Sequence, residues 1–99
     1  MLREKHNRIT PAILIHPGEI LKDELDARGI TQKGLAEKIG RPQQTISMIV
    51  NGRKGISEET AVDLEEAFDG ELTAEFWMNL DANFRLHRER TKRKERKAS

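Results

Sequence analysis

Two adjacent glutamines, Gln43 and Gln44, are the side chains in this sequence whose type and position best suit specific recognition. A carboxamide carries a donor and an acceptor, so one glutamine can pair with the N6 and N7 atoms of adenine together. The first turn of an α-helix lying in the major groove of DNA brings side chains to such base edges. The alternative is that both glutamines are ordinary solvated residues near a helix start.

The segment from residue 31 to residue 51 predicts two short helices that would position these glutamines. Thr31 can cap the first helix with its hydroxyl. Leu35, Ala36 and Ile39 then recur at the spacing of one buried helical stripe. We therefore expect a first helix of about two turns.

A sharp turn separates the two helices. Gly40 suits the left-handed conformation that ends a helix, and Pro42 suits the opening turn of the next one. Ile46 and Ile49 face inward at a spacing of i and i+3, which leaves the glutamines on an outward face. The sequence therefore predicts a helix-turn-helix whose second helix can read bases.

The runs TQKGLAEKIG and GRPQQTISMIVNGRK resemble the phage-repressor (XRE-type) helix-turn-helix family. The resemblance implies that Gln32 holds a phosphate, that residues 43–45 face bases and that residues 51–54 grip the DNA backbone. Two positions depart from the family pattern: Pro42 replaces a Ser or Thr cap, and Gly34 inside a helix costs about 1 kcal/mol relative to alanine. The residues that we expect to contact DNA are Gln32, Arg41, Gln43, Gln44, Thr45, Ser47, Met48, Asn51, Arg53 and Lys54.

Composition favours a small helical domain. The chain has 99 residues, of which 35% are charged and 4% aromatic, and it has no cysteine. Disulfides, thiolate metal sites and cysteine nucleophiles are therefore excluded. No apolar run approaches the roughly 20 residues of a membrane span, and no signal-peptide core is present. We expect a cytoplasmic protein without a membrane segment.

Charge is divided unevenly along the chain. The formal net charge is +1, but residues 31–55 carry +4, residues 56–84 carry −9 and residues 85–99 carry +6. A chain with little net charge can therefore still present a basic face to phosphates. The acidic segment is either a solvated face or a surface that attracts a basic partner.

We expect an all-α, five-helix phage-repressor-like domain at residues 13–86, between a mobile arm (residues 1–12) and a basic tail (residues 87–99). The first helix runs from Pro17 to about Arg28, and the fourth from a Ser57 cap to Phe68. The tail is either a solvated extension of the fifth helix or disordered. His16 and Glu19 lack a third ligand, so neither a metal site nor a cofactor is expected.

The fifth helix, which Thr73 would cap, carries most of the aromatic surface of the chain. We weigh two interpretations of this stripe, which are core packing and the interface of a homodimer. Its residues are Phe76, Trp77, Leu80 and Phe84.

The segments IHPGEIL and LTAEFWMNLDANFRL, together with the helix-turn-helix, resemble the HigA antitoxin branch of the repressor-like family. This resemblance implies a homodimer that binds palindromic operators in double-stranded DNA, represses its own operon and neutralises a HigB-type toxin, an mRNA-cleaving ribonuclease. The alternative is a stand-alone XRE-type transcriptional regulator without a toxin partner. An enzyme is not expected, because the sequence has no Gly-rich phosphate loop, nucleophile elbow or catalytic constellation.

Overall fold

The computed structural model describes residues 15–98, and its regular elements there are all α-helices. The expected all-α fold is confirmed, whereas the expected arm at residues 1–12 lies outside the described residues. In chain order the five helices are α1 (Pro17–Arg28), α2 (Gln32–Ile39), α3 (Gln43–Val50), α4 (Glu58–Ala67) and α5 (Ala74–Ala98).

Hydroxyl caps and left-handed glycines set several helix ends where the sequence predicts them. The side-chain oxygens of Thr31, Ser57 and Thr73 each accept a hydrogen bond from the backbone N–H three residues further on, at 2.9, 3.2 and 3.1 Å. These bonds satisfy donors that the first turn of a helix otherwise leaves unpaired. Gly29 and Gly40 follow α1 and α2 with φ angles of 68° and 70°, in the region where a side chain is unfavourable.

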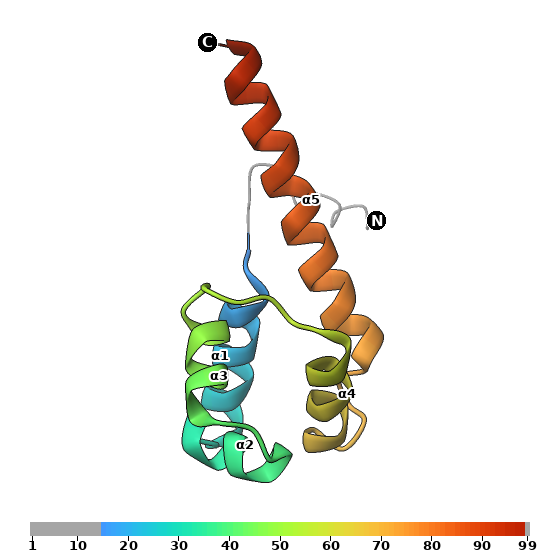
Figure 1. Ribbon diagram of the computed structural model, residues 1–99. Helices are drawn as coiled ribbons and strands as arrows, with labels where there is room; N and C mark the ends of the chain where they lie inside the picture. The colour runs from blue at the N-terminus through green and yellow to red at the C-terminus, as the bar shows by residue number, and fades with distance from the viewer. Residues whose placement is uncertain (1–14, 99) are drawn as a thin grey trace.

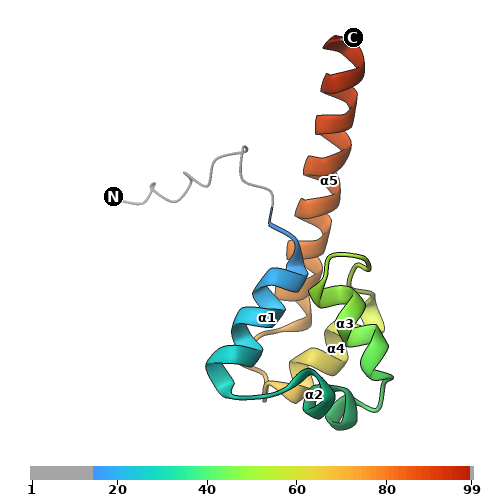
Figure 2. The same cartoon turned by 90° about the vertical axis from the view of Figure 1, so that its left-hand side faces the viewer.

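Helices α1, α2 and α3 lie together, and α4 pairs with the beginning of α5 (Figure 1). Contacts of α2 with α4, and of α1 with α5, join these two groups. The later part of α5 extends away from the other helices in both views (Figure 2). The helix-turn-helix is therefore held between α1 and α4, and α5 forms a projecting arm.

All five helices contribute to one apolar core. Most inward positions predicted from helical spacing are buried, whereas Ile39, predicted on the buried stripe of α2, is half-buried at the edge of this core. At one point the backbones themselves meet, because a Cβ atom on Gly18 would collide with the carbonyl oxygen of Ile49. The first turn of α1 thus rests directly on the end of α3. The buried apolar side chains are Leu21, Leu25, Leu35, Ala36, Ile46, Ile49, Ile56, Ala61, Leu64, Ala67, Phe68 and Trp77.

The basic end of the chain is helical, which decides between the two predicted alternatives for the tail. Helix α5 runs without a break through the expected domain boundary at residues 86 and 87. Among the described residues no helix combines the length and the apolar character needed to cross a membrane.

Candidate nucleic-acid interface

Helix α3 presents the two glutamines from a firmly held position. Ile46 and Ile49 on its inner side are fully buried, whereas Gln43 and Gln44 in its first turn are exposed. Pro42 precedes the helix and provides no side-chain hydrogen bond to it. The first-turn N–H groups therefore lack a side-chain cap, and they add partial positive charge beside the glutamines.

The remaining predicted contacts on α3 extend along the same outward side. Thr45 and Ser47 are half-buried, whereas Met48 and Asn51 are exposed. The side-chain amide of Asn51 donates to the hydroxyl of Ser47 at 3.3 Å, so these two side chains lie on the same side of the helix. Gln32 is half-buried at the first position of α2, next to the cap of that helix.

Arg41 differs from the other predicted contacts, because its side chain is turned toward α4. Its Nε atom donates to a carboxylate oxygen of Asp63 at 2.5 Å, and a second nitrogen lies 3.5 Å from Glu59. The hydrogen bond with Asp63 raises the pKa of Arg41 above its ordinary value. Arg41 therefore joins α4 to the turn between α2 and α3, and its role as a DNA contact remains a prediction.

A buried acid that the sequence analysis overlooked supports the turn after α3. Asp81 on α5 is 4% exposed and accepts a hydrogen bond from the backbone N–H of Ile56 at 3.1 Å. Its other oxygen accepts from Nε of Arg85 at 2.8 Å. A Cβ atom on Gly55 would lie 2.7 Å from Asp81 Oδ1, so a residue without a side chain permits this approach.

The sequence did contain a signal for Asp81. Trp77, Asp81 and Phe84 follow the i, i+4, i+7 spacing of one helix face, which places a carboxylate on an otherwise apolar stripe. The charge pattern alone places Asp81 among the acids of residues 56–84 without distinguishing it from them. An acid at a core position with an arginine four residues later indicates a buried structural role.

His16 caps α1 with its ring. Its Nδ1 atom accepts a hydrogen bond from the N–H of Gly18 at 2.9 Å, and its ring meets the edge of Phe84 at a centroid distance of 4.7 Å. Burial is the largest of the effects that lower the pKa of His16. Within residues 15–98 no group of three His, Cys, Asp or Glu side chains is arranged to hold a metal ion.

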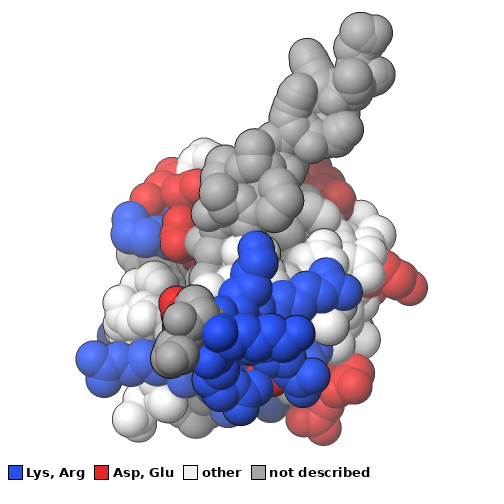
Figure 3. Space-filling view, turned by 90° about the horizontal axis from the view of Figure 1, so that it is seen from above, with Lys and Arg blue, Asp and Glu red and all other residues white. Residues whose placement is uncertain are grey.

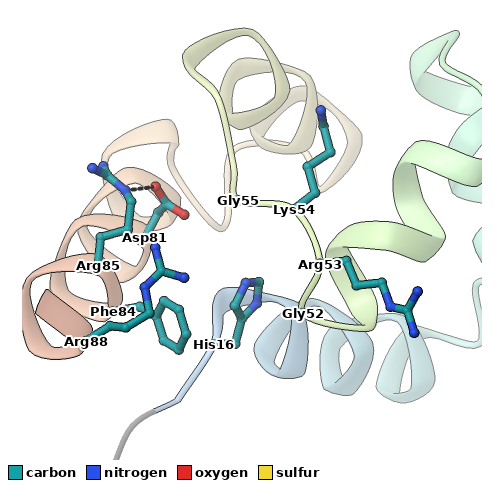
Figure 4. Close-up of a pocket in the computed structure, with 9 residues that line it drawn as sticks. All are labelled: His16, Gly52, Arg53, Lys54, Gly55, Asp81, Phe84, Arg85 and Arg88. Atoms are coloured by element: carbon teal, nitrogen blue, oxygen red, sulfur yellow. Dashed lines mark hydrogen bonds and ion pairs between the residues drawn. The ribbon is translucent and has the colours of Figure 1, made fainter. Parts of the chain in front are cut away.

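A cavity of about 220 Å³ lies where the start of α1, the turn after α3 and the middle of α5 meet (Figure 4). We call it the basic pocket, because four of its lining residues are cationic and one is acidic. The charged lining residues are Arg53, Lys54, Arg85, Arg88 and Asp81, and His16 forms part of the wall. Figure 4 shows Asp81 directed toward Arg85, with the Arg88 guanidinium near His16.

The aromatic stripe of α5 divides between the two predicted roles. Trp77 is fully buried inside the chain, 6.2 Å from the ring of Phe68 and 5.2 Å from that of Phe76. Trp77 is therefore a core residue, as the first of the two interpretations predicts, and its side chain is not on the surface of this chain. Phe76, Leu80 and Phe84 are half-buried, so the dimer-interface prediction now depends on these three residues.

Basic side chains gather on the projecting part of α5. In the view along the molecule from above, Lys and Arg cover the centre of the surface, where the end of α5 points toward the viewer (Figure 3). Within this region Glu89 pairs with Arg93 at 3.0 Å and with Lys92 at 3.8 Å. Residues 85–99 nevertheless carry a net charge of +6, so the electrostatic potential around this arm is positive.

Comparison with known proteins agrees with this geometry. A family model for the helix-turn-helix matches residues 21–74. Virulence-associated protein A of Dichelobacter nodosus is 40% identical over 74 residues, which are 74% of this chain and 72% of that protein. Antitoxin HigA-1 of Vibrio cholerae is 41% identical over 64 residues, or 64% of this chain and 58% of the antitoxin, less than two thirds of its length.

A solved structure of Pseudomonas aeruginosa antitoxin HigA with the higBA promoter superposes with a TM-score of 0.78. It is 35% identical and covers 85% of this chain and 90% of the antitoxin. The fold and the outward face of α3 thus define a helix-turn-helix regulator of the DNA-binding class. The chain belongs to the XRE-type helix-turn-helix family and is a homologue of the HigA antitoxins.

The lowered pKa of His16 predicts that its contribution to stability depends on pH. The unfolded chain takes up a proton near pH 6.5, the ordinary pKa of histidine, whereas the folded chain resists protonation because the ring is partly buried and Nδ1 is occupied. The free energy of unfolding should therefore fall as the pH drops below this value. His16→Asn keeps a capping oxygen but does not titrate, so it is the matched control.

Urea denaturation at pH 7.5 and pH 5 measures this effect. We expect wild-type protein to lose more stability between the two values than His16→Asn does. Equal losses in both proteins would contradict the assigned role of His16.

Proposed function

We propose that this chain is a sequence-specific DNA-binding antitoxin that represses its own operon as a homodimer and neutralises a HigB-type ribonuclease toxin. The observation that carries the proposal is the pair of exposed glutamines on the first turn of a helix whose other side is fully buried. Such a protein acts where the operator is, which we propose is the cytoplasm.

The dimensions of the outward face suit the major groove of DNA. Helix α3 has eight residues and is therefore about 12 Å long, close to the width of the groove. Gln32 precedes this face, and Arg53 and Lys54 follow it, so phosphates on both sides of the groove have polar partners. Neither Arg53 nor Lys54 forms an ion pair with another described residue.

Removing either glutamine should weaken sequence discrimination. We expect Gln43→Ala or Gln44→Ala to cost roughly 1 to 3 kcal/mol on the promoter DNA of this gene and little on random DNA, because base contacts are lost. Arg53→Ala should weaken binding to both duplexes alike and flatten the salt dependence. Fluorescence anisotropy on both duplexes over a range of salt concentrations separates these effects, and equal losses for a glutamine variant would refute base reading.

A homodimer explains how so small a reading surface specifies one site. One recognition helix reads only a few base pairs, and two-fold symmetry sets two helices about 34 Å apart along the duplex. The half-buried residues Phe76, Leu80 and Phe84 follow one another at i, i+4 and i+8 along α5 and supply the apolar surface that we assign to the interface.

Leu80→Glu should produce a monomer, because it places a charge in the centre of this apolar stripe. Asn79→Glu introduces the same charge on the neighbouring exposed position and should leave the dimer intact. Sedimentation velocity gives the masses, and circular dichroism verifies that both variants remain helical. A folded Leu80→Glu dimer would remove this interface from the proposal.

The acidic face of α4 is the surface that we assign to the toxin. Glu58 and Glu66 are exposed and have no ion pair among the described residues, whereas Asp63 and Glu59 are engaged with Arg41. The first two carboxylates are therefore free to attract a basic protein. A stand-alone regulator would have the same face as a solvated surface only.

The toxin assignment predicts stoichiometric capture of a small basic protein encoded beside this gene. We expect Glu58→Lys combined with Glu66→Lys to weaken capture by at least tenfold, because like charges are then opposed. Glu37→Lys on α2 serves as the control, because it makes the same change of charge at a position outside α4. Biolayer interferometry with the purified neighbour measures the affinities. Absence of any such complex, with promoter binding intact, would favour the stand-alone regulator.

A further inference from the structure

We propose that the basic pocket binds a phosphate group of the DNA backbone, which makes α5 a part of the DNA interface. This inference rests on the DNA binding proposed above. It adds Arg88 and His16, which lie outside the helix-turn-helix, to the residues that hold the duplex.

The charge of the pocket favours an anion. Arg53, Lys54, Arg85 and Arg88 line it together with one carboxylate, that of Asp81. Asp81 already accepts from Arg85 and from the backbone N–H of Ile56. Arg88 has no carboxylate partner among residues 15–98, so its charge is available to a ligand in the pocket. Figure 4 shows the side chains of Arg53 and Lys54 directed away from the cavity, so these two residues contribute a positive field around the pocket and the direct contact falls to Arg88. The fork of N–H donors on a guanidinium group matches the oxygens of a phosphate.

Neighbouring rings hold the groups that would contact the phosphate. The guanidinium carbon of Arg88 lies 5.2 Å from the ring centroid of Phe84. The ring of His16 packs against the same phenylalanine ring. Because Nδ1 of His16 accepts from Gly18, the neutral ring carries its proton on Nε2. His16 therefore adds an uncharged N–H donor to the cationic wall.

The position and size of the pocket suit a backbone phosphate. One side of it is formed by residues 52–54, the turn that follows α3, which we expect to lie at the edge of the groove. Its volume of about 220 Å³ equals that of about seven liquid water molecules at roughly 30 Å³ each, enough for a phosphate and some water. A phosphate held in the pocket would therefore lie against both the turn after α3 and α5.

The test compares Arg88→Gln with Arg90→Gln, which removes the same charge from an exposed position of α5 outside the pocket. Binding to the promoter duplex is measured over a range of salt concentrations. Each phosphate contact contributes about 0.9 to the slope of log affinity against log salt concentration. We expect Arg88→Gln to lose a slope of about that size, Arg88→Lys to recover most of it, and Arg90→Gln to stay close to wild type.

A set of duplexes, each with one neutral methylphosphonate, identifies the phosphate itself. At one position the substitution should weaken wild-type binding about tenfold, the size expected for a charge-assisted contact, and weaken Arg88→Gln binding less than twofold. Additive losses at every position would overturn the inference.

Two further outcomes separate this inference from the proposed function. If wild-type protein does not bind its promoter, the proposed function and the pocket assignment both fail. If it binds, and Gln43→Ala loses specificity but Arg88→Gln behaves as Arg90→Gln does, the pocket assignment alone is overturned. Titration with inorganic phosphate, followed by the NMR signals of the His16 ring, detects a pocket that takes only a free anion, and that result also overturns the DNA assignment.

Discussion

The hydrogen bond from the Ile56 backbone to Asp81 is the contact on which the placement of the candidate interface depends. Asp81 is the only buried charged side chain in the described part of the chain. A buried carboxylate is stable only when its oxygens are occupied, and Ile56 and Arg85 occupy them. Because Gly55 has no side chain, the segment leaving α3 lies directly against α5. The turn that carries Arg53 and Lys54 therefore takes its position from a helix outside the helix-turn-helix.

Features that depend on neighbouring residues could be predicted from the sequence. The caps at Thr31, Ser57 and Thr73 involve a side chain and a backbone group only three residues apart. The inward stripes, such as Ile46 and Ile49, follow from helical spacing alone. These local rules were enough to predict five helices and the outward face of α3.

Features that join distant segments could not be predicted in the same way. Arg41 and Asp63 are 22 residues apart, and Ile56 and Asp81 are 25 apart. Their pairing depends on how α4 and α5 pack against the helix-turn-helix, which no local spacing contains. Trp77 shows the same limit, because the sequence places it on an apolar stripe but does not say whether that stripe meets this chain or another.

The electrostatic design of the molecule follows from these long-range pairs. Asp63 and Glu59 neutralise Arg41 at the turn between α2 and α3. Positive charge is instead concentrated at the opposite end of α3, beside the basic pocket, and along the arm of α5. A duplex approaching this chain meets a directional field rather than a uniform one, although the net charge is only +1.

The projecting arm of α5 gives the protein two kinds of melting behaviour. An isolated helix shorter than about 12 to 15 residues is marginal in water, because its first turn is costly to nucleate. In α5 that nucleus is supplied by the packed turns around Trp77, and the later turns only propagate it with pairs such as Glu89 and Arg93. The end of the helix therefore unwinds and rewinds gradually without unfolding the core, whereas the packed helices unfold together. Local helix–coil equilibrium at one end thus coexists with a cooperative transition in the rest of the chain.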